Sequence, residues 1–331
     1  MISTDIGIDL GTSNILIYEK RKGIVLNEPC VVAIENRTKK VIAVGKEAYD
    51  MVGRTPGKIK AIRPLKNGVI ADLEITEIML NEFIKKIKSK KLFIKPRVLI
   101  CCPANITPLE KETLKEVAER TGARKVYIEE EAKVAAIGAG LDISKPIANM
   151  IVDIGGGTTD IAVLSLDDIV KSSSIKTAGN TLNANIIKYI KEKYKLLIGD
   201  LTAEKIKTSF ANVYNPKDIT MNVKGRNLIT GLPSIIKINQ KEIKESLQGS
   251  VEKIIKEIIS ILESTPPELS SDIIDKGIVL TGGTSQLIGL LELIEEKTKI
   301  PTLIAASPLT CVAEGTGILL DSLKLLEEDQ I

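Results

Sequence analysis

The segment Asn149 to Leu166 consists of two apolar strand-like runs joined by a tight glycine-rich turn, with Asp153 at the end of the first run. Glycines allow positive φ angles, and because they lack a Cβ they let successive backbone N–H groups approach an anion. The hydroxyls of Thr158 and Thr159 add hydrogen-bond donors, and Asp153 can hold a hydrated cation opposite that anion. The segment therefore predicts a hairpin that binds a phosphate together with a divalent metal ion.

A similar pattern stands near the N-terminus, where Asp9 and residues 11–14 separate two apolar runs. Two occurrences of one pattern indicate an internal duplication, which constrains the fold more than either motif alone. We expect two similar halves, each of which offers one hairpin to a ligand held between them. Asp9 and Asp153 would then converge on one metal ion. The alternative is a pair of unrelated structural hairpins, since Gly-Gly turns between strands are common.

Composition limits the classes of function. A chain of 331 residues exceeds one usual hydrophobic core and predicts two domains or lobes. The net charge of +3 argues against a nucleic-acid binder, and the absence of histidine excludes Ser-His-Asp and HExxH chemistry. The four cysteines lack a metal-ligand spacing and predict reduced core thiols in a cytosolic protein. No apolar run suits a membrane span or a signal peptide, so we expect neither a membrane-spanning segment nor export by the signal-peptide route.

The hairpin sequences DLGTSN and DIGGGTTD resemble the first and second phosphate motifs of the actin, sugar kinase and heat-shock ATPase superfamily. Residues 59–74, 265–283 and 308–317 further resemble the bacterial actins of the MreB family. The resemblance implies an α/β actin-like ATPase fold: two related lobes, each with a mixed β-sheet flanked by helices, and a nucleotide cleft between them. Lobe I would comprise residues 1–145 with a small subdomain IB at about 33–70, and lobe II residues 146–312 with subdomain IIB at about 181–239, while helix 313–331 packs back on lobe I.

The same resemblance implies that the cleft binds ATP and Mg²⁺, with GTP as the alternative nucleotide. Asp9 and Asp153 would hold the metal through water molecules. The chain lacks GxxxxGK[ST] and is therefore not a P-loop NTPase. Phosphate contacts would come from both hairpins and from one later glycine: Gly11, Thr12, Ser13, Asn14, Gly155, Gly156, Gly157, Thr158, Thr159 and Gly179.

Three carboxylates at residues 129–131 precede a helix of small residues, and the positive end of that helix is a sufficient structural reason for them. In the superfamily, the last carboxylate before this helix orients the water that attacks the γ-phosphate. The resemblance assigns that catalytic role to Glu131, together with Thr158. Glu129 and Ala132 depart from the family pattern, which usually has an apolar residue and a proline at these positions.

Two segments resemble nucleoside-binding motifs. In the first, Glu204 would bind the ribose hydroxyls and Lys207 would lie beside the base, although an ordinary i, i+3 surface pair explains this spacing equally well. In the second, Gly282 and Gly283 would let the backbone pack flat on the base, and a helix is expected over residues 286–298. Thr284 stands where the family commonly has a third glycine.

Residues 178–183 resemble an AGDxxD-type turn near the phosphates, but asparagine occupies both acidic positions, at Asn180 and Asn183. Asparagine keeps the hydrogen bonding and withdraws negative charge close to the metal site. We therefore expect nucleotide binding to be retained and hydrolysis to be the uncertain step. A weakly hydrolysing or non-hydrolysing structural protein remains an alternative. A helix is expected from Asn183 to Lys195.

By resemblance, the chain would hydrolyse ATP slowly and polymerise head to tail into paired filaments that govern cell shape or movement. A sugar kinase is less favoured, because the chain shows no insertion for a substrate pocket.

We expect a cytoplasmic protein, peripheral at the inner face of the cell membrane. Leu92 and Phe93 lie between lysines, which suits insertion at an anionic lipid surface, as the matching loop does in MreB. Alternatively, this pair closes the core beneath the preceding helix. Expected partners are further copies of the chain, the anionic membrane surface and membrane adaptor proteins, but no nucleic acid.

Overall fold

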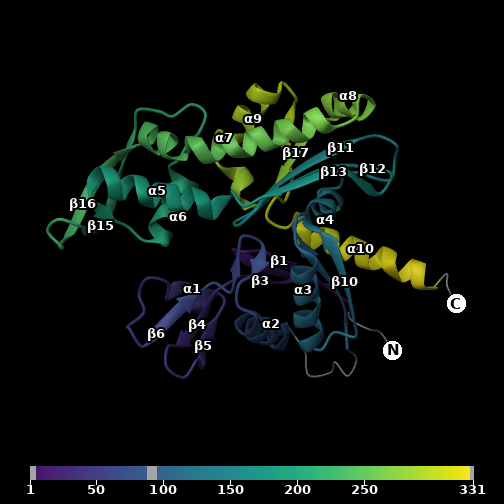
Figure 1. Cartoon of the computed structure of the whole chain (residues 1–331), viewed down its shortest axis with the longest axis horizontal. Coiled ribbons are helices and arrows are strands. Elements are labelled where there is room, and N and C mark those ends of the chain that lie inside the picture. The colour runs from purple at the N-terminus through teal and green to yellow at the C-terminus, as the bar shows by residue number, and fades with distance from the viewer. Residues whose placement is uncertain (1–4, 88–94, 329–331) are drawn as a thin grey trace.

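The computed structural model of the chain describes residues 5–87 and 95–328, with side chains described up to residue 322. Two lobes lie one above the other in Figure 1, and the C-terminal helix α10 (Cys311–Glu328) runs between them. The predicted membrane residues Leu92 and Phe93 lie outside the described residues. In the described part of the chain, no helix combines the length and the apolar character that a membrane crossing requires.

The first large sheet belongs to the lower lobe in Figure 1 and has the strand order β10-β9-β1-β2-β3. Its first three strands in sequence form an antiparallel meander, whereas β9 and β10 are added in parallel to β1. The strands are β1 (Ile6–Leu10), β2 (Asn14–Glu19), β3 (Gly23–Pro29), β9 (Arg97–Cys102) and β10 (Lys125–Glu130).

The second large sheet repeats this topology with the order β18-β17-β11-β12-β13. Again an antiparallel meander comes first, and two parallel strands are added beside its first strand. This repetition confirms the predicted pair of related lobes. The strands are β11 (Asn149–Ile154), β12 (Thr159–Ser165), β13 (Asp168–Ile175), β17 (Ile278–Thr281) and β18 (Thr302–Ile304).

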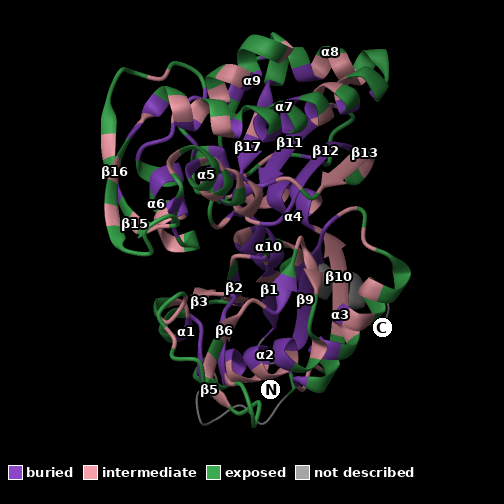
Figure 2. Cartoon of the chain, turned by 60° about the vertical axis from the view of Figure 1, so that its left-hand side comes forward, coloured by how far each residue is buried: buried purple, intermediate pink, exposed green. Residues whose placement is uncertain are grey.

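Each sheet has its own apolar core, as the buried residues in Figure 2 show. Strands β9, β11 and β12 are buried along their whole length, because helices or strands cover both faces. In the first lobe, α2 (Leu73–Ile87) and α3 (Pro108–Arg120) flank the sheet. In the second lobe, α5 (Gly179–Tyr194), α7 (Gln240–Ser264), α8 (Pro267–Lys276) and α9 (Leu290–Thr298) surround it.

A small subdomain projects from each lobe. In the first lobe, β4 (Val32–Glu35), β5 (Val41–Val44) and β6 (Ile59–Ile62) form a sheet beside α1 (Lys46–Asp50), and β7 (Leu65–Lys66) pairs with β8 (Val69–Ile70). In the second lobe, β14 (Leu196–Leu197), β15 (Thr220–Asn227) and β16 (Pro233–Asn239) form a sheet near α6 (Asp200–Ser209). These correspond in position to the predicted subdomains IB and IIB, whose limits stay predictions, as do those of the lobes.

Two predicted helices differ in the structure. Helix α5 begins at Gly179 rather than at Asn183. The segment 178–183, expected to be a turn near the phosphates, therefore forms the N-terminal part of this helix. The helix expected over residues 286–298 is divided into a short 3₁₀ turn, η1 (Gly283–Gln286), and α9. Gly289 separates them with a φ of 85°, and a Cβ at this position would lie 2.6 Å from the backbone nitrogen of Tyr214. Gly289 therefore lies outside the helical conformation and packs closely against that segment, so that the predicted helix begins only at Leu290.

The two lobes meet where α4 (Glu131–Gly138) crosses α10 (Figure 1). A Cβ on Gly138 would lie 1.8 Å from the carbonyl oxygen of Cys311, and one on Gly315 would lie 2.0 Å from that of Val134. The two helix backbones are therefore in direct contact. A core of small and branched side chains from both lobes surrounds the crossing: Cys101, Ala132, Val134, Ala135, Ala136, Ile143, Ile151, Ala162, Leu164 and Val312.

Candidate functional site

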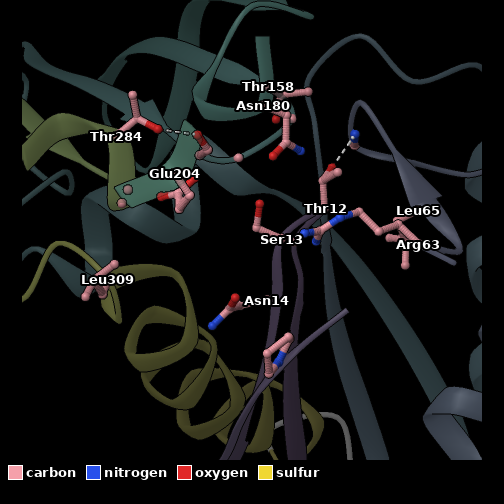
Figure 3. A pocket seen from close by; sticks show the side chains of 18 of the residues that line it. Thr12, Ser13, Asn14, Arg63, Leu65, Thr158, Asn180, Glu204, Thr284 and Leu309 are labelled. Carbon is pink, nitrogen blue, oxygen red and sulfur yellow. Dashed lines mark hydrogen bonds between the residues drawn. The ribbon is translucent and has the colours of Figure 1, made fainter. Parts of the chain in front are cut away.

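A cavity of about 920 Å³ opens between the lobes and is lined from both sides. The turn after β1 contributes Thr12 and Ser13, and the turn after β11 contributes Gly156 and Thr158. Figure 3 shows Thr12 and Ser13 on one side of this space, with Glu204 and Thr284 on another. The duplicated hairpins therefore face one shared cleft, as their sequences predict.

The two hairpin turns are in close contact. A Cβ on Gly156 would lie 1.9 Å from Oγ of Ser13, and a Cβ on Gly157 would lie 2.3 Å from Oγ1 of Thr12. The backbone nitrogen of Gly155 donates to the carbonyl oxygen of Thr158 at 3.0 Å, which closes the second turn. These glycines form a cradle that any larger residue would fill, and such bare backbone suits the approach of phosphate oxygens.

The first hairpin is fixed to the small subdomain of its own lobe. Oγ1 of Thr12 accepts a hydrogen bond from the backbone nitrogen of Gly68 at 2.8 Å (Figure 3). Gly68 has a φ of 78°, and a Cβ there would lie 2.9 Å from Cγ2 of Thr158 in the other lobe. Residues between β7 and β8 therefore reach the cleft, although the phosphate motifs alone give no signal for them.

Carboxylates are concentrated where the hairpins meet. Removal from water raises the pKa of Asp9 to about 7. Burial also raises the pKa of Asp153, and the charges of Asp160 and Asp9 add to this effect. Burial and the charges of Asp160, Asp9 and Asp153 raise the pKa of Glu131. Without a cation, these acids therefore hold protons above their ordinary range, and a nearby positive charge would favour their ionised forms.

Asp160 is a member of this cluster to which the sequence motif assigned no role. It is 1% exposed, and its Oδ1 accepts a hydrogen bond from the backbone nitrogen of Ala104 at 3.3 Å. Burial raises its pKa, while hydrogen bonds from Ser174 and Thr158 oppose that rise. The carboxylate of Asp160 therefore accepts a hydrogen bond from Thr158, which lines the cleft. Its place as the last residue of DIGGGTTD is the signal by which it could have been noticed.

The residues present fit a hydrated divalent cation better than a fully coordinated one. Asp9 and Asp153 both line the cleft and both are desolvated. Among the described residues, no group of three or more acidic or cysteine side chains is arranged to bind a metal directly. Two carboxylates facing an anion cradle suit Mg²⁺, which retains several water molecules and binds one or two protein carboxylates together with phosphates.

A second polar group lies at the far end of the cleft, on α5 and α6. Oε2 of Glu204 accepts hydrogen bonds from Nδ2 of Asn183 at 2.6 Å and from Nζ of Lys207 at 2.8 Å. Lys207 also donates to the carbonyl oxygen of Gly179 at 3.3 Å. Oδ1 of Asn183 is buried without a hydrogen-bond partner in the described structure. The predicted pair is therefore a network within the cleft rather than an isolated surface pair.

Thr284, which occupies a position commonly held by glycine in the family, connects this end of the cleft to the second hairpin. Its Oγ1 donates a hydrogen bond to the carbonyl oxygen of Gly155 at 2.8 Å (Figure 3). Gly282, two residues before Thr284, has a φ of 82°, and a Cβ there would lie 2.3 Å from Oδ1 of Asp153. The turn after β17 therefore supports both a phosphate hairpin and a metal-site carboxylate.

Two predicted phosphate ligands are not brought to the cleft wall. Thr159 is fully buried and donates its hydroxyl to the carbonyl oxygen of Thr177 at 2.7 Å, because alternation along β12 turns it away from Thr158. Gly179 lies behind Thr284, where a Cβ would be 2.7 Å from Oγ1. The other predicted site residues do line the cleft: Asp9, Gly11, Thr12, Ser13, Asn14, Glu131, Asp153, Gly155, Gly156, Gly157, Thr158, Glu204, Lys207, Gly282, Gly283 and Thr284.

Comparison with known proteins gives extensive sequence matches. The family described as MreB/Mbl protein matches residues 3–328. The cell shape-determining protein Mbl of Bacillus subtilis is 55% identical over 332 residues, covering 100% of both proteins. The cell shape-determining protein MreB of Escherichia coli is 47% identical over 331 residues, covering 98% of this chain and 95% of that protein.

Solved structures agree with these matches. MreB 5 of Spiroplasma citri bound to AMPPNP is 42% identical, with a TM-score of 0.95 and coverage of 100% of each chain. The same protein bound to ADP gives a TM-score of 0.93 at 42% identity over 98% of each chain. A MamK filament structure, at 22% identity and a TM-score of 0.83 over 97% of this chain and 99% of that chain, shares the fold. The chain therefore belongs to the MreB/Mbl family of cell shape-determining, actin-like proteins.

Proposed function

We propose that the cleft binds ATP with Mg²⁺, that the chain hydrolyses the nucleotide slowly, and that it polymerises into filaments at the membrane. The main support is the convergence of two glycine-containing hairpins, each preceded by an aspartate, on one cleft between the lobes. The complexes of MreB 5 with AMPPNP and ADP support a nucleotide as the ligand.

In this proposal the backbone and hydroxyl groups of both hairpins bind the phosphates, while Asp9 and Asp153 hold the hydrated metal ion. Glu204 binds the ribose hydroxyls, and Lys207 lies beside the base. Mg²⁺ would supply positive charge that offsets the negative charge of the two carboxylates and of the phosphates. Phosphoryl transfer needs positioning and electrostatic stabilisation more than a covalent nucleophile, so a site without histidine suffices.

Glu131 is the proposed water-orienting group, and Thr158 assists it. Support comes from its place at the start of α4, buried in the cleft wall among three other carboxylates. The charge of a bound metal ion would keep Glu131 ionised, as acceptance of a water proton requires. Its neighbour Glu129 instead forms an ion pair with Lys133 at 3.6 Å, which makes Glu129 a suitable control.

Self-association is the proposed consequence of nucleotide binding. The turn between β15 and β16 exposes apolar side chains at one extremity of the molecule in Figure 1: Ile229 is 80% exposed and Leu232 is 64% exposed. Ile235 on β16 is 61% exposed. Such a patch suits contact with another copy, and head-to-tail contacts that do not close into rings produce filaments. Paired filaments are part of the proposal.

Membrane association is proposed from the sequence alone. Leu92 and Phe93 stand between lysines and suit an anionic lipid surface at the inner face of the membrane. Replacement of both by serine should abolish co-sedimentation with anionic liposomes and leave nucleotide binding intact. Unaltered co-sedimentation would contradict this part of the proposal. Membrane adaptor proteins are proposed as further partners.

The decisive experiment combines sedimentation with phosphate release in the presence of Mg²⁺ and ATP, GTP, AMPPNP or ADP. We expect polymer with ATP, slow phosphate release, and a loss of release of about 100-fold in Glu131→Ala but not in Glu129→Ala. Nucleotide binding should remain in both variants. Polymer without phosphate release would support a structural, non-hydrolysing protein, the alternative favoured by Asn180 and Asn183. Sugar-dependent turnover without polymer would support a phosphotransferase instead.

A further inference from the structure

The cleft is rich in acids but offers few available positive charges. Four cationic side chains line it: Lys46, Arg63, Lys66 and Lys207. Lys207 pairs with Glu204 at 2.8 Å, and Lys46 pairs with Asp50 at 2.9 Å. Because a nucleoside triphosphate adds several negative charges beside Asp9, Glu131 and Asp153, a further cation besides the metal ion would favour its binding.

Arg63 is placed to supply that charge. It follows β6 in the small subdomain of lobe I and is half-buried, whereas Lys66 is exposed. Among the described residues, no carboxylate lies within ion-pair distance of Arg63, and its guanidinium lies 5.8 Å from the centre of the Tyr49 ring. In Figure 3 the side chain extends from the cleft wall toward Thr12 and Ser13.

The effect of the Arg63 charge on the pKa of Cys30 agrees with a position of Arg63 near the first hairpin. The thiol of Cys30 donates a hydrogen bond to the carbonyl oxygen of Gly11, in the first hairpin, at 3.0 Å. Burial raises the pKa of Cys30, and the charge of Asp9 adds to the rise, whereas the positive charge of Arg63 lowers it. The positive charge of Arg63 therefore acts on a side chain that is hydrogen-bonded to the first hairpin turn.

We propose that Arg63 is a phosphate-binding residue that reaches from the small subdomain to the terminal phosphate of a bound nucleoside triphosphate. The planar guanidinium can donate two parallel hydrogen bonds to phosphate oxygens, and its weak hydration suits a half-buried position over an aromatic ring. Its contact would exist with a triphosphate and be lost with a diphosphate. The small subdomain would thereby respond to hydrolysis. This inference rests on the proposed nucleotide function.

The test compares the affinities of AMPPNP and ADP, each with Mg²⁺, by isothermal titration calorimetry. We expect Arg63→Ala to weaken AMPPNP binding about tenfold or more and ADP binding by less than about twofold. Arg63→Lys should retain part of the charge but not the paired hydrogen bonds, and so give an intermediate loss. Arg63→Gln, which keeps much of the length and polarity, should behave like alanine.

Two matched controls remove a positive charge without removing the proposed contact. Arg54→Ala and Arg37→Ala each change an exposed arginine of the same subdomain that does not line the cleft. Both should alter the two affinities equally and by little. Circular dichroism of every variant tests folding, and the lysine and glutamine variants serve if alanine destabilises the subdomain.

The outcomes separate the two proposals. If the unmodified chain binds neither nucleotide, the proposed function is wrong. If it binds both and the Arg63 variants lower the two affinities in the same proportion, or lower neither, the inference about Arg63 is wrong. A loss confined to AMPPNP supports it.

Discussion

The two hairpins at the cleft have the same order of strand, aspartate, turn and strand, yet they contribute to it differently. The turn after β1 presents side chains, since Thr12 and Ser13 project from it and Thr12 also holds Gly68. The turn after β11 presents bare backbone, because its glycines leave the space that the side chains of the first turn occupy. One hairpin therefore supplies the polar groups, and the other supplies the space that they occupy.

This difference explains why the two turns should tolerate substitution unequally. A change in the first turn removes a hydrogen bond, whose net value is modest, whereas a new side chain in the second turn must displace its partner. Four predictions test the comparison, in order of decreasing effect.

The largest effect is expected from added volume in the second turn. Gly156→Ala and Gly157→Ala place a Cβ within 2.3 Å of atoms in the first turn, so we expect nucleotide affinity to fall about tenfold to a hundredfold. Gly57→Ala adds a Cβ where no atom lies within 4 Å and is the matched control. Calorimetric titration measures the affinities, and a tolerated alanine in the second turn would refute the proposed packing.

The second effect concerns pH in the ligand-free, metal-free protein. The pKa of Asp9 is raised from 3.8 to about 7, so its stabilising contribution is complete below about pH 4 and is lost as pH rises toward 7. We expect the melting temperature to be a few degrees lower at pH 8 than at pH 5.5. Asp9→Asn should remove this part of the pH dependence and stabilise the protein at pH 8. Asp275→Asn, at an exposed position on α8, should leave the profile unchanged.

The third effect is the loss of one side-chain acceptor from the first turn. Thr12→Val removes the acceptor for the backbone nitrogen of Gly68, and we expect unfolding free energy to fall by about 1 kcal/mol. Thr12→Ser keeps the hydroxyl and should retain most of that stability. Urea unfolding of the three proteins measures the difference. Equal stability of the valine and serine variants would show that this hydrogen bond has no net value.

The smallest effect is expected at the far end of the cleft, away from the hairpins. Asn183→Asp would place a second carboxylate beside Oε2 of Glu204, with Lys207 left to offset the repulsion. We expect nucleotide affinity to fall by roughly twofold to fivefold. Adding Glu204→Gln to this variant should give less than the sum of the two separate losses. Strict additivity would mean that the two side chains do not interact.

Much of the site follows from local sequence. Glycine, aspartate and threonine in a fixed order identify both hairpins, and their repetition indicates a shared cleft. Long-range packing does not follow from it. Gly68 lies far from Thr12 in the sequence but donates a hydrogen bond to it. Thr159 points away from the cleft, because side chains alternate between the two faces of β12. The sequence assigns Asp160 no role beyond its place in the motif, whereas the fold buries it and places it in hydrogen-bond contact with Thr158.

The fold shows the same division. The order of apolar strands predicts two related lobes, since periodicity is a local property. The ends of α5 and α9 depend instead on neighbours. The backbone nitrogens of Gly179 and Asn180 donate to the carbonyl oxygens of Gly155 and Gly156, which places the start of α5 at the cleft. The start of α9 is delayed to Leu290, because Gly289 has a positive φ and packs closely against Tyr214. No spacing rule identifies such partners in advance.

The glycine contact between α4 and α10 has a mechanical consequence. Because Gly138 and Gly315 bring two backbones together, no layer of side chains there can compress or slide. A relative rotation of the lobes that preserves this contact would pivot about it, so that displacement would grow with distance from it. The two small subdomains form the ends of the lever arms, and a slight turn at the pivot would be amplified at the surfaces that a neighbouring copy would touch.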